Sequence, residues 1–383
     1  MEHHELHAWL RLTLTEGVGP DAAQRLLRAF GDAPRVFASS EAHWREHVSA
    51  RQAAALQQVP AALAVQVART QQWLREAPAT RALWTWHHPA YPAVLRDLHD
   101  APPLLYAQGR DVTDFDALVL SPALAVVGSR NPTPQGAQNA RDLAHALCAR
   151  GLCIVSGLAL GIDGAAHLGA LDAATEAPQR CLTVAVVGTG LDRVYPRQHQ
   201  ALAQDIASHG ALLSEYPLGA PPLAAHFPRR NRLIAALGRG TLVVEAAMQS
   251  GSLITAGLAL DLGREVFAVP GSIHAPQSRG CHALIRQGAK LVETAHDVLD
   301  ELPGLDAAHT LPHRVVPAAD KPTDMGDGVA EGVLTCLGYD PVDLDRLQAR
   351  SGLDASAVQA VLFTLELQGR VARLPGGLFQ RLG

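Results

Sequence analysis

A short apolar run in the middle of the chain is followed by residues that suit phosphate binding. Leu124–Val127 is apolar throughout and leads into Gly128, Ser129 and Arg130. A glycine lets the backbone approach an anion closely, a serine adds a hydroxyl, and the planar guanidinium of an arginine matches phosphate oxygens. We therefore predict that Gly128, Ser129 and Arg130 contact phosphate.

Two further loops have the same character. The apolar run Leu152–Val155 is followed by Ser156 and Gly157, and Ser250, Gly251 and Ser252 precede a helical pattern that ends near Gly263. Amides in a glycine-rich loop and at a helix N-terminus attract anions. The first two loops are predicted to face one crevice, and the third to offer amides and hydroxyls to an anion as well.

Basic charge is concentrated between Leu191 and Gly240, although the whole chain has a formal net charge of −5. This stretch contains Arg193, Arg197, Arg229, Arg230, Arg232 and Arg239 against Asp192, Asp205 and Glu215, with Phe227 and Asn231 among the arginines. Aromatic rings that stack on unpaired bases, beside arginines that hold phosphates, are typical of proteins that bind single-stranded nucleic acid. The alternative is that Phe227 is a core residue beside a solvated helix end. Arg130 and the glycine-rich loops favour DNA binding.

These residues require a parallel sheet with helices between its strands. Thr133 is predicted to cap a helix with Pro134 at its first position, so that Leu124–Val127, this helix and Leu152–Val155 form a strand–helix–strand unit. Further strands are predicted at Leu182–Val187, Ala211–Ser214, Thr241–Glu245 and Val266–Val269. The predicted fold class is therefore α/β with a Rossmann-type parallel sheet. The dinucleotide fingerprint G-x-G-x-x-G is absent after the first strand, and neither of the two lysines belongs to a P-loop.

At 383 residues the chain is long enough for two or three domains. We predict an N-terminal helical domain over residues 1–80, a sheet domain over 81–302, a linker over 303–328 and a small domain over 329–383. His87–Gly109 is predicted to be a proline-punctuated connector. The turn at Gly17-Val18-Gly19 could seat a DNA phosphate, but a change of direction in a helical bundle is the favoured interpretation.

The C-terminal domain is predicted to be three helices followed by a hairpin. The helices are expected at Val333–Leu337, Val342–Ala349 and Ala355–Gln368, and the hairpin strands at Val371–Leu374 and Leu378–Arg381.

Composition excludes several classes of protein. The five cysteines form no C-x-x-C pair and the eighteen histidines show no metal-ligand spacing, so we expect neither a disulfide framework nor a metal or other cofactor. No run approaches the roughly 18 apolar residues of a membrane span. We expect a cytoplasmic protein with no membrane partner.

Acidic residues near the crevice could suggest a hydrolase with paired carboxylates. Asp163 is more simply a helix N-cap, and Glu245 an orienter of arginines. Ser129 or Ser156 with His167 could imitate a nucleophile and its base, but a serine in a glycine turn usually bonds to the backbone. We therefore expect no enzymatic activity.

Seven segments in one order resemble the DNA-processing protein A family (DprA, also called Smf). They are VVGSR, SGLALGID, AVVGTGLDRVYP, LLSEYP, HFPRRNRLIA, SGSLITA and REVFAVPG. The resemblance implies an extended Rossmann fold that binds and protects single-stranded DNA, forms a homodimer and loads RecA recombinase during natural transformation. It implies that Arg130 grips phosphate, that Phe227 to Arg232 is the family's F-P-x-R-N-R segment, and that the C-terminal domain is a winged helix. The alternative, a nucleotide phosphoribohydrolase of the lysine-decarboxylase-like Rossmann group, requires a P-G-G-x-G-T motif that the chain lacks.

Overall fold

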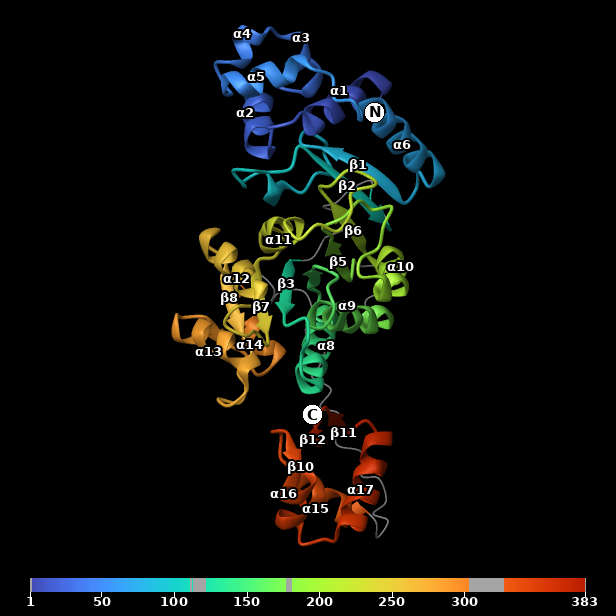
Figure 1. Cartoon of the computed structure of the whole chain (residues 1–383), viewed down its shortest axis with the longest axis vertical. Coiled ribbons are helices and arrows are strands. Elements are labelled where there is room, and N and C mark those ends of the chain that lie inside the picture. The colour runs from blue at the N-terminus through green and yellow to red at the C-terminus, as the bar shows by residue number, and fades with distance from the viewer. Residues whose placement is uncertain (1, 111, 113–121, 177–180, 303–326, 383) are drawn as a thin grey trace.

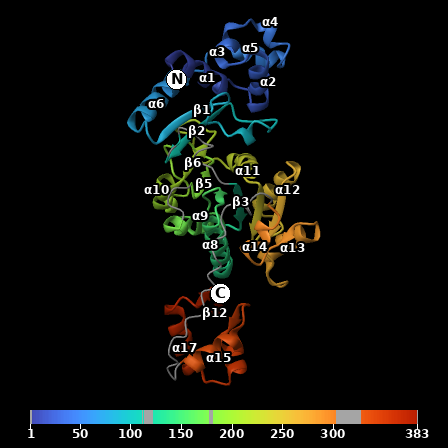
Figure 2. The same cartoon turned by 180° about the vertical axis from the view of Figure 1, so that it is seen from behind.

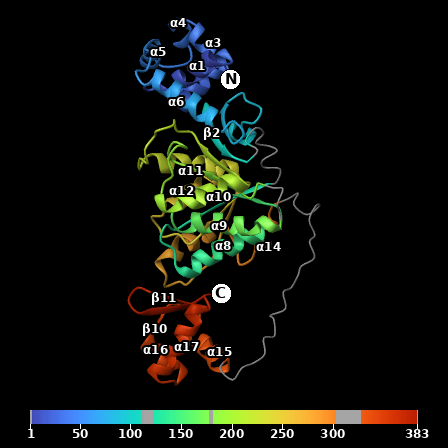
Figure 3. The same ribbon diagram turned by 90° about the vertical axis from the view of Figure 1, so that its right-hand side faces the viewer.

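The structure of the chain is a computed structural model that describes residues 2–110, 112, 122–176, 181–302 and 327–382. Figures 1 and 2 show a helical part at one end, a central sheet domain, and a small C-terminal module at the other end. Figure 3 shows the same succession from the side. The predicted linker lies outside the described residues, except for Asp327 and Gly328, which begin a helix.

A nine-stranded sheet forms the centre of the molecule, with the order β1-β2-β6-β5-β4-β3-β7-β8-β9. The strands are β1 (Arg81–Thr85), β2 (Leu104–Gly109), β3 (Ala123–Gly128), β4 (Cys153–Ser156), β5 (Thr183–Val186), β6 (Ala211–Ser214), β7 (Gly240–Val244), β8 (Glu265–Ala268) and β9 (Lys290–Leu291). The strands from β6 to β9 are parallel, whereas β2 runs antiparallel to both β1 and β6. The α/β fold class with a large parallel sheet is confirmed.

Apolar residues cover both faces of this sheet, as expected of strands joined by crossover helices. Alternate residues of β3 show the pattern, because Val126 belongs to one buried cluster and Ala125 and Val127 to another. One face is covered by α8 (Pro134–Ala149), α9 (Ile162–Asp172), α10 (Gln200–His209) and α14 (Ala295–Leu299), and the other by α11 (His226–Leu237), α12 (Gly251–Asp261) and α13 (Arg279–Arg286). Thr133 caps α8 as predicted, since its side chain accepts a hydrogen bond from the Gly136 amide (3.0 Å). No helix among the described residues is long and apolar enough to cross a membrane.

The prediction that His87–Gly109 is only a connector is wrong. Its last six residues form β2, which pairs with β1 and β6 and extends the sheet. Leu105, Tyr106 and Ala107 are fully buried, because this strand carries apolar side chains on both faces. The prolines that suggested irregular structure, Pro102 and Pro103, lie just before the strand begins.

Six helices form the N-terminal part: α1 (His3–Leu14), α2 (Pro20–Phe30), α3 (Ala33–Ala38), α4 (Glu41–Trp44), α5 (Ala50–Gln57) and α6 (Leu63–Glu76). Their buried side chains belong to the same apolar cluster as residues of β2, β5 and α10. The hydroxyl groups of Thr70 on α6 and Tyr106 on β2 are 3.2 Å apart. The side chain of Gln24 on α2 donates a hydrogen bond to the Leu98 carbonyl (3.0 Å). The helical part is therefore packed against the sheet domain.

The C-terminal module has its own apolar core and its own small sheet. It contains α15 (Asp327–Leu337), β10 (Val342–Asp343), α16 (Leu344–Ser351), α17 (Ala355–Leu367), β11 (Val371–Leu374) and β12 (Leu378–Arg381). The predicted start of a helix at Val342 is wrong. Val342 and Asp343 pair with Phe379 and Leu378 as a strand, and the Asp343 carboxylate caps the helix that follows by accepting from the Arg346 amide.

Candidate nucleic-acid interface

A cleft of about 460 Å³ opens beyond the carboxyl end of β3. The chain leaves β3 toward β4 on one side and later returns to β7 on the other, so the strand order reverses at β3. Ligands of open parallel sheets bind at such a reversal, beyond the carboxyl ends of the strands. The three glycine- and serine-containing loops meet here, because the cleft is lined by Gly128–Asn131, Ala159 and Gln249–Ser252.

The first loop is held by its main chain and leaves Arg130 exposed. The Ser129 amide donates to the Glu245 carbonyl (2.7 Å), and the Ser129 carbonyl accepts from the Ile162 amide (3.0 Å). The Ser129 hydroxyl accepts from the Asn131 amide (3.1 Å) and retains its own proton for a further acceptor. The Arg130 guanidinium lies 5.5 Å from the centre of the Phe227 ring. The loop therefore presents a hydroxyl and a guanidinium to the cleft.

The third loop places a helix N-terminus at the same cleft. Ser250 caps α12, with its hydroxyl accepting from the Ser252 amide (3.3 Å) and lying 2.6 Å from the Ser252 hydroxyl. Gly251 is exposed and a side chain at this position would meet nothing within 4 Å. An anion can therefore approach the first amides of α12 closely.

A small pocket of about 100 Å³ adjoins the cleft and is mainly aromatic and apolar. Its walls include Arg130, Leu160, Tyr195, Pro196 and Phe227. Phe227 is half-buried, and its ring centre lies 5.6 Å from that of Tyr195, at an angle of 38°. Phe227 is thus neither a buried core residue nor a freely exposed side chain.

Tyr195 is a residue that the sequence prediction missed. It is 47 % exposed, and its ring lines the aromatic pocket beside Phe227. Its signal in the sequence is its place between Arg193 and Arg197, an aromatic residue among basic ones. Both of these arginines are exposed, as is Arg229 on α11. Arg193, Arg197 and Arg229 line neither the cleft nor the aromatic pocket, and they stay in the candidate contact set because they are exposed.

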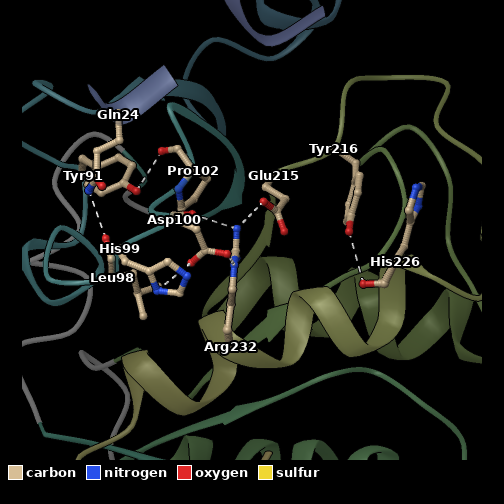
Figure 4. Close-up of polar contacts among 10 residues, drawn as sticks. All are labelled: Gln24, Tyr91, Leu98, His99, Asp100, Pro102, Glu215, Tyr216, His226 and Arg232. Atoms are coloured by element: carbon tan, nitrogen blue, oxygen red, sulfur yellow. Dashed lines mark hydrogen bonds and ion pairs between the residues drawn. The ribbon is translucent and has the colours of Figure 1, made fainter. Parts of the chain in front are cut away.

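The structure gives Arg232 a different role from the predicted phosphate contact. Its side chain is buried, and its Nε donates to the Asp100 carboxylate (2.7 Å) while its Nη2 donates to the Glu215 carboxylate (2.7 Å). Figure 4 shows the three charged groups side by side above α11. Burial raises the pKa of Glu215, and the charge of Arg232 opposes that shift. Arg232 thus joins α11 to the loops that carry Asp100 and Glu215.

Arg230 and Ser156 are also buried rather than presented to a ligand. The Arg230 guanidinium donates to the carbonyls of Gly157 (2.6 Å) and Val186. The Ser156 hydroxyl donates to the Val126 carbonyl (2.6 Å) inside the sheet. We therefore leave Arg230, Arg232 and Ser156 out of the proposed contact set, since each is buried and already donates to a carbonyl or a carboxylate.

Asp163 does not cap its helix as predicted. The cap position of α9 belongs to Gly161, and the buried Asp163 carboxylate accepts hydrogen bonds from the amides of Gly157 (3.1 Å) and Ala159 (3.3 Å). Burial raises the pKa of Asp163, while the nearby Arg230 opposes that shift.

Glu245 does not orient an arginine among the described contacts. Its carboxylate accepts from the amide of Thr133 (2.8 Å) and from the hydroxyl of the same residue. It therefore supports the N-terminus of α8, where a negative charge is favourable.

Ser156 and His167 do not form a pair of nucleophile and base. His167 is buried and its Nδ1 lies 2.7 Å from the Thr183 hydroxyl, whereas Ser156 bonds to Val126. Across residues 2–110, 112, 122–176, 181–302 and 327–382, no group of three or more histidine, cysteine or acidic residues could hold a metal ion.

Comparison with known proteins points to one family. A family model described as DNA recombination-mediator protein A matches residues 82–303, and one described as DprA winged helix domain matches residues 317–377. The chain is 40 % identical over 347 residues to Protein Smf of Escherichia coli, which covers 88 % of this chain and 89 % of that protein. It is 48 % identical over 212 residues to the DNA processing protein DprA of Streptococcus pneumoniae, covering 55 % of this chain and 71 % of that protein.

Two solved structures agree with that family. The crystal structure of DNA processing protein A from Streptococcus pneumoniae superposes with a TM-score of 0.63 and 36 % identity, over 79 % of this chain and 98 % of that one. DNA processing protein A from Helicobacter pylori, described for its single-stranded DNA binding mode, has a TM-score of 0.50 and 29 % identity, over 57 % of this chain and 94 % of that one. The family predicted from the sequence is confirmed: the chain belongs to the DNA recombination-mediator protein A (DprA/Smf) family.

Proposed function

We propose that this protein binds single-stranded DNA through the cleft beyond β3 and the adjoining aromatic pocket. The observation that carries the proposal is the group formed by Arg130, Phe227 and Tyr195, in which an exposed guanidinium and two aromatic rings line one pocket beside three loops rich in glycine and serine. The Helicobacter pylori relative, described for its single-stranded DNA binding, supports this assignment.

The pocket favours single strands because a ring can stack only on a base whose face is uncovered. In a duplex both faces of every internal base are covered by its neighbours, whereas an unpaired base can turn toward Phe227 and Tyr195. Its phosphate would then lie toward Arg130 and the amides of the first turn of α12.

The nucleotide phosphoribohydrolase is the competing proposal, and we favour a protein without enzymatic activity. The acidic residues that such an enzyme would use have structural partners, since Asp163 holds the amides of Gly157 and Ala159 and Glu245 holds Thr133. Neither carboxylate faces a water-activating base or a second carboxylate among the described contacts.

One titration separates the two proposals. Fluorescence anisotropy of a labelled 20-nucleotide single strand is measured with unlabelled single strand, duplex of the same sequence, or adenosine monophosphate as competitor. We expect competition by the single strand at far lower concentrations than by duplex or mononucleotide, and no base released from the mononucleotide. Equal competition by the mononucleotide together with release of its base would support the enzyme instead.

The cellular role is proposed from the family resemblance. We infer that the protein protects incoming DNA and loads RecA recombinase onto it in the cytoplasm during natural transformation and recombination. A RecA ATPase assay on single strands coated with a single-strand-binding protein tests this role, because a loader shortens the lag before ATP hydrolysis begins.

We also infer a homodimer. Within the described residues β9 is an edge strand of the sheet, and Leu291 on this strand, Leu260 on α12 and Ile273 after β8 are 41 %, 54 % and 75 % exposed. Exposed apolar side chains at an open sheet edge favour association with another chain. Light scattering should therefore give twice the chain mass for the wild type and a smaller mass for Ile273→Asp.

A further inference from the structure

Arg230 lies in the wall between the phosphate-binding cleft and the aromatic pocket. The residue is 3 % exposed, yet it lines both cavities. Its Nη1 donates to two carbonyls, that of Gly157 just after β4 and that of Val186 at the end of β5, and its Nε donates to the Asn231 side chain (3.3 Å). An arginine that grips DNA keeps its guanidinium free for phosphate oxygens, whereas the guanidinium of Arg230 joins two segments of main chain.

The peptide units on either side of Gly157 are held by two buried and opposite charges. The Gly157 carbonyl accepts from Arg230 (2.6 Å), and its amide donates to the Asp163 carboxylate (3.1 Å). A side chain at position 157 would lie 2.5 Å from both terminal nitrogens of Arg230, so it would displace the guanidinium from its present position. Burial lowers the pKa of Arg230 to about 10, and the charge of Asp163 opposes that shift. Arg230 therefore stays charged at neutral pH, and Asp163 offsets part of that charge.

The loop from Gly157 to Gly161 shapes both binding cavities. Ala159 lines the cleft and the aromatic pocket, and Leu160, which is 40 % exposed, forms part of the aromatic pocket alone. The amide of Ile162, just after this loop, bonds to the Ser129 carbonyl of the first loop (3.0 Å). A change in the loop would therefore move the wall beside Phe227 and the segment that carries Arg130 together.

We propose that Arg230 is a positioning residue for single-stranded DNA binding: it does not touch the DNA, and it holds the loop 157–161 in the shape that both cavities require. Asp163 is its counterpart on the other side of Gly157. The inference rests on the proposed function, because the loop that Arg230 holds forms part of the same binding site.

The salt dependence of binding distinguishes positioning from phosphate contact. Each phosphate contact contributes about 0.7 to the slope of log affinity against log salt concentration for single strands. Anisotropy titrations at several salt concentrations are made with the full chain and with Arg230→Met, Arg230→Lys and Asp163→Asn. We expect each variant to bind single strands about tenfold or more weakly, which is the effect of disturbing one stacked base. The slope of log affinity against log salt concentration should equal that of the wild type.

The lysine and asparagine variants make the test sharp. Lysine retains the charge, but its side chain is shorter and does not bring a donor to the position of Nη1, the atom that donates to both carbonyls, so Arg230→Lys should bind as weakly as Arg230→Met. Asp163→Asn removes a negative charge from beneath the cleft. It would strengthen DNA binding if Arg230 held a phosphate, and it weakens binding if the pair acts on the loop.

A double variant guards against misfolding. Asp163→Asn combined with Arg230→Met leaves no unpaired buried charge, so it is the variant of choice if the single changes lower the melting temperature strongly. It should bind weakly with the wild-type slope. Arg130→Ala is the matched control, since an exposed phosphate contact should lower the slope by about 0.7.

Two results would overturn the inference: wild-type affinity in Arg230→Lys, or a slope reduced by about 0.7 in Arg230→Met together with tighter binding by Asp163→Asn. Neither result affects the proposed function, because the wild type would still bind single strands and Arg130→Ala would still show a lower salt slope. A wild-type protein that does not bind single strands would instead refute the proposed function itself.

Discussion

Replacing Phe227 with alanine tests whether its ring stacks on a base. The ring lies between the Arg130 guanidinium, 5.5 Å away, and the Tyr195 ring, 5.6 Å away, on the wall of the aromatic pocket. The substitution removes the surface on which a base would rest and leaves the phosphate-binding loops unchanged. DNA binding should therefore lose its base-dependent part and keep its electrostatic part.

The structure sets the size of the expected effect. Stacking on an aromatic side chain contributes about 1–3 kcal/mol per base. Tyr195 remains as a second ring in the variant, so we expect the lower part of that range, about 1–2 kcal/mol, or about 5- to 30-fold in Kd. Phe227 is half-buried, so the free energy of unfolding should fall by about half of the 3–5 kcal/mol measured for buried phenylalanines.

An oligonucleotide with abasic sites isolates the base-dependent part. Anisotropy titrations compare the wild type and Phe227→Ala on a normal 20-nucleotide strand and on one in which the central positions lack bases. We expect the two proteins to differ on the normal strand and to bind the abasic strand equally. Phe363→Ala on α17, where the side chain is 63 % exposed, is the matched control and should bind both strands as the wild type does.

Two outcomes would refute the reasoning about Phe227. Equal weakening on normal and abasic strands would show that the ring does not stack on a base. Normal binding at 5 °C, combined with a much lower melting temperature, would show that Phe227 only supports the local fold.

Three further predictions concern other parts of the molecule. If Arg130, Arg193, Arg197 and Arg229 each hold one phosphate, the slope of log affinity against log salt concentration should have a magnitude of about 2.8 for the wild type and about 2.1 for Arg130→Ala. Between 50 and 200 mM salt, the wild type should therefore lose about 50-fold in affinity and Arg130→Ala about 18-fold. A chain that ends at Leu302 should bind single strands within about twofold of the full chain by anisotropy, because the α17 sequence contains no lysine or arginine to contact phosphates; a much larger loss would place a DNA contact in the C-terminal module. Burial lowers the pKa of His167 to about 3 from 6.5, so between these pH values the unfolded chain binds more protons and stability falls as the pH falls. Between pH 7 and pH 5, urea unfolding should show that the free energy of unfolding falls by about 2 kcal/mol in the wild type and not in His167→Gln. Equal losses in both proteins would contradict the assignment.

The sequence predicted six strands of the central sheet, because they are short and apolar on both faces. β3 and β4 lie within one residue of the predicted runs, and Thr133 caps α8 as expected. β1, β2 and β9 were not predicted, and β2 was missed because the prolines that precede it suggested irregular structure. The local sequence of a strand does not indicate with which distant strands it pairs.

The site was predicted less completely, because charge in a sequence does not reveal burial. Arg229, Arg230 and Arg232 are close neighbours on α11, yet Arg229 is exposed and the other two are buried beside acceptors. Helical spacing alone could not separate them, since the acceptors of Arg232 come from Asp100 and Glu215, far away in the chain. Tyr195 is a candidate because its ring lies against that of Phe227, a contact that the sequence does not show.

The contact between the N-terminal helices and the sheet has a consequence for dissecting the molecule by deletion. The family model begins at residue 82, but the apolar cluster crosses that point without interruption, and Thr70 and Tyr106 meet across it. A fragment that starts at Arg81 would expose Tyr106 and Leu218 to water and would lose the bond from Gln24 to Leu98. Leu98 lies two residues before Asp100, which holds α11 through Arg232. Weak DNA binding by such a fragment would therefore not identify the N-terminal helices as a DNA-binding region, because their removal also loosens the helix that carries Phe227.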